Sequence, residues 1–87
     1  MDVTIMVIQH GDPETHELYE EETDGRVYSN HELAEKDLKR WFFGVKLDYY
    51  NRAEKVTRYS GVMDRLDDSE EYFVITLFDK EIIKEAE

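Results

Sequence analysis

Two histidines begin the same short pattern, which is the arrangement in this chain closest to known metal chemistry. The stretches His16-Glu-Leu-Tyr-Glu20 and His31-Glu-Leu-Ala-Glu35 both read H-E-L-x-E. In each copy a glutamate stands where the zinc motif H-E-x-x-H has its second histidine, so one of the two ligands on the helix face is lost. We therefore predict that the repetition is coincidental and that the protein holds no metal and no other cofactor.

The remaining reactive residue types form no catalytic pattern either. Ser29, Ser60 and Ser69 have no base and orienting acid at a recognisable spacing. The acids between 67 and 71 lack the register of a calcium-binding loop, the four glycines are scattered, and cysteine is absent. We predict from this that the protein is not an enzyme.

The segment from Ser29 to Gly44 carries the clearest secondary-structure signal. Ser29 and Glu32 fit a capping box at a helix start, and Gly44 is the residue type that commonly ends a helix in the left-handed conformation. Apolar residues recur between them at helical spacing, namely Leu33, Ala34, Leu38, Trp41, Phe42 and Val45. These features predict a helix over about residues 30–43, with Trp41 and Phe42 as core anchors.

Strand signals lie at both ends of the chain. Residues 3–9 are β-branched and apolar, which predicts a buried, central strand that Gly11-Asp-Pro13 ends. Residues 71–79 are dense in strand formers. Residues 56–66 favour a partner strand for them in a C-terminal hairpin, although a helix broken at Gly61 is an alternative. If the segment is a strand, Gly61 marks a bulge or a close backbone approach.

Two segments leave alternatives open. Residues 14–22 could form a short helix, but we prefer a hairpin because Thr23-Asp24-Gly25 lies between two apolar pairs of residues. Residues 45–53 give no clear signal. Together, these elements predict a single domain of the α+β class over residues 1–87. In it, an antiparallel sheet of about five strands with two hairpins packs against one central helix.

Charge limits the partners that the protein can have. Its 87 residues include 22 acids and 11 bases, for a net charge of −11, and no basic cluster stands clear of acids. Binding to nucleic acid or to an anionic membrane is therefore disfavoured, while a basic protein partner is favoured. The start of the chain has no basic region before a signal-like apolar run, so we expect a cytoplasmic protein. Solubility alone is the alternative reason for the acid excess.

The acids concentrate in two regions, residues 12–24 and 64–71, each interleaved with tyrosine. Carboxylates spread over a rigid domain can imitate nucleic-acid phosphates in a basic groove, and tyrosines can anchor such an interface. We predict that the partner is bound by Glu17, Tyr19, Glu20, Glu21, Glu22, Asp24, Asp64, Asp67, Asp68, Glu70, Glu71 and Tyr72.

In size, acidity and lack of cysteine, the chain resembles small phage-encoded inhibitors of host defence, which include anti-CRISPR proteins and nucleic-acid mimics. This resemblance implies a non-enzymatic inhibitor of a basic, nucleic-acid-handling protein, acting in the host cytoplasm. The chain is similar in the same way to bacterial immunity proteins and antitoxins that cap a basic toxin. A structural protein that self-associates, for example as a homodimer, is the further alternative.

Overall fold

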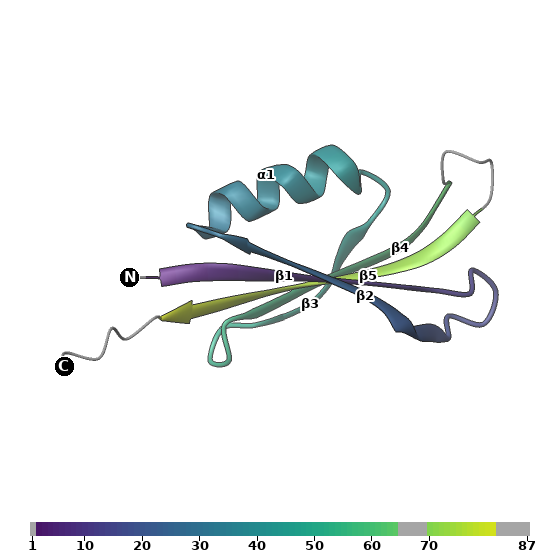
Figure 1. Cartoon of the computed structure of the whole chain (residues 1–87), viewed down its shortest axis with the longest axis horizontal. Helices are drawn as coiled ribbons and strands as arrows, with labels where there is room; N and C mark the ends of the chain where they lie inside the picture. Colours follow the sequence, from purple (N-terminus) through teal and green to yellow (C-terminus); the bar gives the residue numbers. More distant parts are fainter. Residues whose placement is uncertain (1, 65–69, 82–87) are drawn as a thin grey trace.

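The chain forms one antiparallel sheet and one helix in a computed structural model that describes residues 2–64 and 70–81, the side chains of residues 20–23 excepted. The strands and the helix follow the order β1 (Asp2–Gly11), β2 (Leu18–Tyr28), α1 (His31–Trp41), β3 (Lys46–Asn51), β4 (Val56–Asp64) and β5 (Glu70–Glu81). Across the sheet the strands lie in the order β2-β1-β5-β4-β3 (Figure 1). The predicted α+β class and the antiparallel sheet are confirmed.

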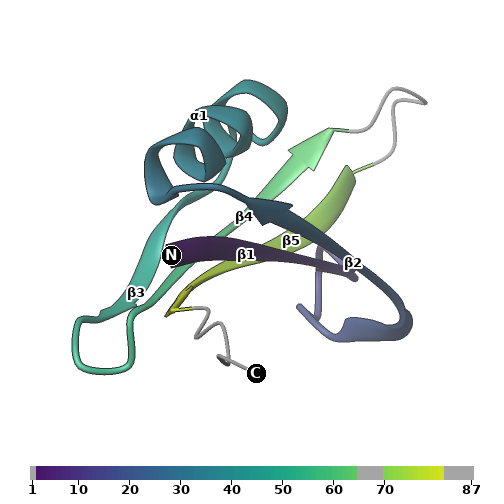
Figure 2. The same ribbon diagram turned by 60° about the vertical axis from the view of Figure 1, so that its left-hand side comes forward.

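The helix covers one face of the sheet, and the core lies between the two (Figure 2). Alternate residues of the two central strands point to the helix, since side chains along a strand alternate between faces. Met6 on β1 and Ile75 and Leu77 on β5 are completely buried there. The core is completed by Ile8, Ala34, Leu38, Val45 and Met63.

The helix begins one residue later than a Ser29 cap predicts. Asn30 is the N-cap, and its side-chain oxygen accepts a hydrogen bond of 2.9 Å from the backbone N–H of Leu33. The expected capping box is therefore wrong, because the residue at the third helical position is Leu33 and not Glu32. Gly44 also has a different role, since no glycine in residues 2–64 or 70–81 has a positive φ.

Only a narrow stripe of the helix faces the sheet. Ala34 and Leu38, four residues apart, are buried, and Phe42 continues the stripe just beyond the last turn. Trp41 is 57% exposed and stacks against Arg40 instead. The prediction that Trp41 anchors the core is therefore wrong, and the one for Phe42 is confirmed.

Residues 18–28 form a single strand and not a hairpin. Gly25 lies opposite Val7 and Asp24 opposite Ile8, in the middle of the ladder between β1 and β2. Pairing of β2 with residues 4–11 of β1 thus overrides the local turn signal of Asp24-Gly25. It also leaves β1 between β2 and β5, which confirms the predicted central position of that strand.

The C-terminal hairpin of β4 and β5 is confirmed by their pairing, and β3 adds an edge strand that the sequence did not indicate. Gly61 on β4 is a point of close backbone approach, which is one of the two roles predicted for it. A Cβ atom there would lie 2.7 Å from the Gly44 carbonyl oxygen, and one on Gly44 would lie 2.6 Å from the Met63 side chain. The two glycines therefore let the chain after α1 pass close to β4.

Candidate protein-binding surface

Three strand pairings bring acidic residues to one end of the sheet. Gly11, the last residue of β1, lies opposite Leu18 on β2 and Tyr72 on β5, while Asp64 on β4 lies opposite Glu70. Figure 1 shows the β1–β2 connection, the end of β4 and the start of β5 at this end. We define the acidic end as Asp12, Glu14, Glu17, Asp64, Glu70 and Glu71.

Backbone hydrogen bonds give the loop between β1 and β2 a defined shape. The Asp12 side chain accepts hydrogen bonds from the N–H groups of Glu14 (2.7 Å) and Thr15 (3.1 Å), and its own N–H donates to the Glu17 carbonyl (2.9 Å). The bond from Glu14, followed by that from Thr15, lowers the pKa of the Asp12 carboxyl. Gly11 is required next to this loop, because a Cβ atom there would overlap the Glu17 carbonyl.

Aromatic contacts hold the loop against β5. The His16 ring stacks on the Tyr72 ring with centroids 4.0 Å apart and planes 4° apart. His10 lies against Tyr19 and Phe73, and its Nδ1 atom is 2.8 Å from a Glu71 carboxylate oxygen. The carboxylates of the acidic end are consequently presented from a packed framework.

The structure brings six of the predicted partner-binding residues together, from three strands and the loop before β2: Glu17, Tyr19, Asp64, Glu70, Glu71 and Tyr72. Asp24 lies away from them in the middle of β2, opposite Ile8. Residues 20–22 belong to β2, but their side chains fall outside the described part, as do Asp67 and Asp68 entirely. Sequence reasoning missed the packing roles of His10 and His16, because their aromatic partners are distant in sequence.

A second polar cluster joins the helix to the sheet. His31 Nδ1 lies 2.9 Å from the Asp79 carboxylate on β5, and His31 Nε2 lies 3.1 Å from the Glu35 carboxylate one turn along the helix. The buried Thr4 hydroxyl donates to Asp79 at 2.7 Å, and the Tyr59 hydroxyl donates to Glu35 at 3.4 Å. Because both ring nitrogens of His31 face carboxylates, this cluster suits attachment of α1 to the sheet and not proton transfer to a substrate.

The charges in this cluster stabilise each other. Burial has the largest single effect on the His31 pKa and lowers it, but the hydrogen bonds and charges of Asp79 and then Glu35 outweigh burial and raise the pKa. Burial likewise raises the Asp79 pKa, but hydrogen bonds from Thr4 and His31 and the charges of His31 and Lys55 leave it lowered. The imidazolium and the carboxylate therefore favour each other's charged form.

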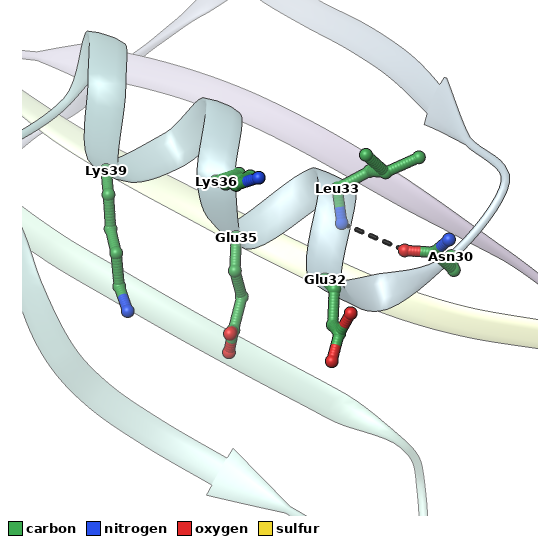
Figure 3. A pocket seen from close by; sticks show the side chains of 6 residues that line it. All are labelled: Asn30, Glu32, Leu33, Glu35, Lys36 and Lys39. Carbon is green, nitrogen blue, oxygen red and sulfur yellow. Dashed lines mark hydrogen bonds between the residues drawn. The ribbon is translucent and has the colours of Figure 1, made fainter.

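The outer side of the helix has a shallow hollow (Figure 3). Its lining residues all come from α1 or its cap, and two acids are followed by two bases: Asn30, Glu32, Leu33, Glu35, Lys36 and Lys39. Figure 3 shows the Glu32, Glu35 and Lys39 side chains extended side by side from the same side of the helix. The two acids and the two bases of this lining balance each other, so this hollow has the character of an ordinary solvated helix face.

Among the side chains that the structure describes, which exclude those of residues 20–23, no three histidines or carboxylates are grouped closely enough to hold a metal ion. The same part of the chain has no helix that is both long and apolar enough to cross a membrane. Comparison of the chain with known protein families, curated proteins and solved structures gave no match. The functional assignment therefore rests on the residues and their arrangement.

Proposed function

We propose that the protein is a non-enzymatic inhibitor that binds a basic, nucleic-acid-handling protein through the acidic end. The observation that carries this proposal is the pairing of β1 with both β2 and β5, which gathers carboxylates from separate segments at one end of the sheet. The loop 12–17 carries three of these carboxylates and contains no lysine or arginine. The surface is therefore suited to a groove lined by basic side chains.

Carboxylates in this arrangement can occupy the positions of nucleic-acid phosphates. Arginine and lysine make charge-assisted hydrogen bonds to carboxylates as they do to phosphates. The hydrogen bonds within the loop and the His16–Tyr72 stack order the surface before binding, so less conformational entropy is lost on association. An inhibitor of the anti-defence type would work in this way, by excluding nucleic acid from its partner.

Apolar groups beside the acids supply anchors for the interface. Leu18 and Tyr72 line a hollow on the sheet face opposite the helix, together with His16 and Arg58. Tyr19, 42% exposed, lies beside the same acids. Tyrosine is enriched among the residues that dominate binding energies, so the acidic end combines steering charge with neighbouring groups that a partner can bury.

The test compares two variants with the same net charge. The first, Glu14→Gln, Glu17→Gln and Glu70→Gln, removes three charges from the acidic end. The matched control removes three exposed charges from the helix, the β3–β4 turn and the far end of β5, namely Glu32→Gln, Glu54→Gln and Glu81→Gln. Each tagged protein is used to capture partners from a bacterial lysate at low salt, with elution by moderate salt and identification by mass spectrometry.

We expect the wild type and the control to retain a basic nucleic-acid-handling protein that the acidic-end variant retains poorly. Three exposed ion pairs at about 0.5 kcal/mol each give about 1.5 kcal/mol, which is about tenfold in affinity. Equal recovery by both variants would contradict the proposal, because binding would then follow total charge and not the acidic end.

A further inference from the structure

The face of the sheet opposite the helix is apolar along β2, β1 and β5. Side chains of β1 alternate between the core and this face. In one row across the ladder, Ile5 lies opposite Val27 on β2 and opposite Phe78 on β5. We define the open face by six residues of these three strands: Ile5, Val7, Leu18, Val27, Tyr72 and Phe78.

β1 has the composition of a strand that is buried on both of its sides. Its run from Val3 to Ile8 is apolar at every position except Thr4, whereas a strand with one solvated face commonly alternates apolar and polar residues. In the part of the chain that the structure describes, the one helix lies on the other face (Figure 2). Val27 on the open face is 69% exposed. An exposed apolar surface of this kind is typical of a site where another element binds.

Charge is distributed unevenly around the open face. To its side, Arg58 on β4 is paired with Asp48 on β3 at 3.3 Å. Lys80 lies at one end of the face, near the end of β5. At the other end, Glu70 lies on the same side of β5 as the open-face residues, and Asp64 on β4 lies opposite it. The open face therefore leads directly into the acidic end.

We propose that an amphipathic helix of the basic partner packs on the open face, with its basic end over the acidic end. This inference rests on the proposed function and names the element of the partner that binds. Residues 5–11 of β1 span about 20 Å at about 3.4 Å per residue, which a helix of about 14 residues matches. Such a helix would give the sheet a second covering layer, as α1 does on the other face.

The charges suit this orientation of the helix. Lysine and arginine are stabilising in the last turn of a helix, where they can make charge-assisted hydrogen bonds to the carboxylates of Asp64 and Glu70. The segment 64–71 has five acids and one base, so its own base does not offset its acids. A second copy of the chain is a poorer occupant, because it would bring another net charge of −11 to the same face.

The test uses a peptide probe and two pairs of substitutions. A capped helical peptide of about 14 residues, with leucines along one side and arginines in its last turn, is titrated into the labelled full chain and followed by amide chemical shifts. The same peptide with glutamine in place of leucine is the ligand control. Leu18→Ala with Val27→Ala alters the open face at side chains that are 36% and 69% exposed. Leu33→Ala with Leu47→Ala is the matched control, on α1 and β3, at side chains that are 46% and 60% exposed.

We expect saturable shifts centred on amides of β1 and β5 and a dissociation constant at least about tenfold weaker in the open-face variant. The factor should be the same at low and moderate salt, because the removed contacts are apolar, and the control variant should bind as the wild type does. The amide spectrum of each variant shows directly whether its fold is retained.

Four results would overturn the inference: no saturable shift in the wild type, equal affinity in the open-face variant and its control, the same response to the glutamine peptide, or occupation of the open face in the free protein. The last would appear as a dimer in sedimentation or as nuclear Overhauser contacts from Ile82 or Ile83 to Ile5. Failure of the peptide test leaves the lysate comparison of the acidic end unaffected, so the two proposals can fail separately.

Discussion

Breaking the contact between His31 and Asp79 should cost stability in a defined pH window. The His31 pKa is raised in the folded protein, so its contribution is complete below its ordinary value of 6.5 and is lost as pH rises through the folded pKa. The Asp79 pKa is lowered, so its contribution is present above its ordinary value of 3.8 and is lost as pH falls through the folded pKa. The pair therefore contributes most between pH 3.8 and 6.5.

The expected magnitude is modest because the pair is partly exposed. The side chains of His31 and Asp79 are 33% and 36% exposed, and solvent screening limits exposed ion pairs to roughly 0.2–1 kcal/mol. We take about 1 kcal/mol, the upper end, because the N···O distance is 2.9 Å and Glu35 holds the other side of the ring. In a domain of this size, 1 kcal/mol corresponds to about 4–8 °C in Tm.

A double-mutant cycle with His31→Gln and Asp79→Asn measures this coupling. The asparagine oxygen can still accept from Thr4, so the cycle isolates the contact with His31. Urea unfolding at pH 5.5 and pH 9 should give a coupling of about 1 kcal/mol at pH 5.5, and less than half of that at pH 9, where the imidazole is neutral. Equal coupling at the two pH values, or none at pH 5.5, would refute the reasoning.

Two further predictions concern the β4 contact and the state of association. Gly61→Ala should lower the free energy of unfolding by about 1–3 kcal/mol because the added Cβ atom meets backbone atoms. The control Gly25→Ala, whose Cβ atom would have its nearest neighbour 3.9 Å away, should lower it by under about 0.5 kcal/mol. Equal effects of the two variants in thermal unfolding would contradict this prediction. Leu47 and Tyr50 are exposed on the edge strand β3, but we expect a monomer in sedimentation equilibrium. The net charge opposes self-association, and a register shift between Leu47 and Tyr49 interrupts the edge of the sheet. A dimer would instead favour the alternative of a self-assembling protein.

The parts of the fold that the sequence predicted are those in which local signals and tertiary pairing agree. The strand around residues 71–79 is rich in strand formers and lies at the centre of the sheet. The hairpin predicted from Asp24-Gly25 was wrong because β2 continues through these residues and pairs there with β1. The prediction for Trp41 was wrong because the apolar contact of the helix with the sheet is confined to the stripe of Ala34, Leu38 and Phe42. Helical periodicity does not specify how wide such a stripe is.

The candidate site is formed by segments that are far apart in the sequence, so no local sequence pattern could have revealed it. Both acidic regions were visible as runs of acids, but their meeting follows from Gly11 pairing with Leu18 and Tyr72 together.

The most direct test of the central claim is the salt dependence of affinity for the purified captured partner. The association constant is measured over a series of salt concentrations for the wild type, the acidic-end variant and the control of equal net charge. The proposed function predicts about tenfold weaker binding and a shallower dependence on salt for the acidic-end variant alone. The same loss in both variants, or in neither, would contradict binding through the acidic end.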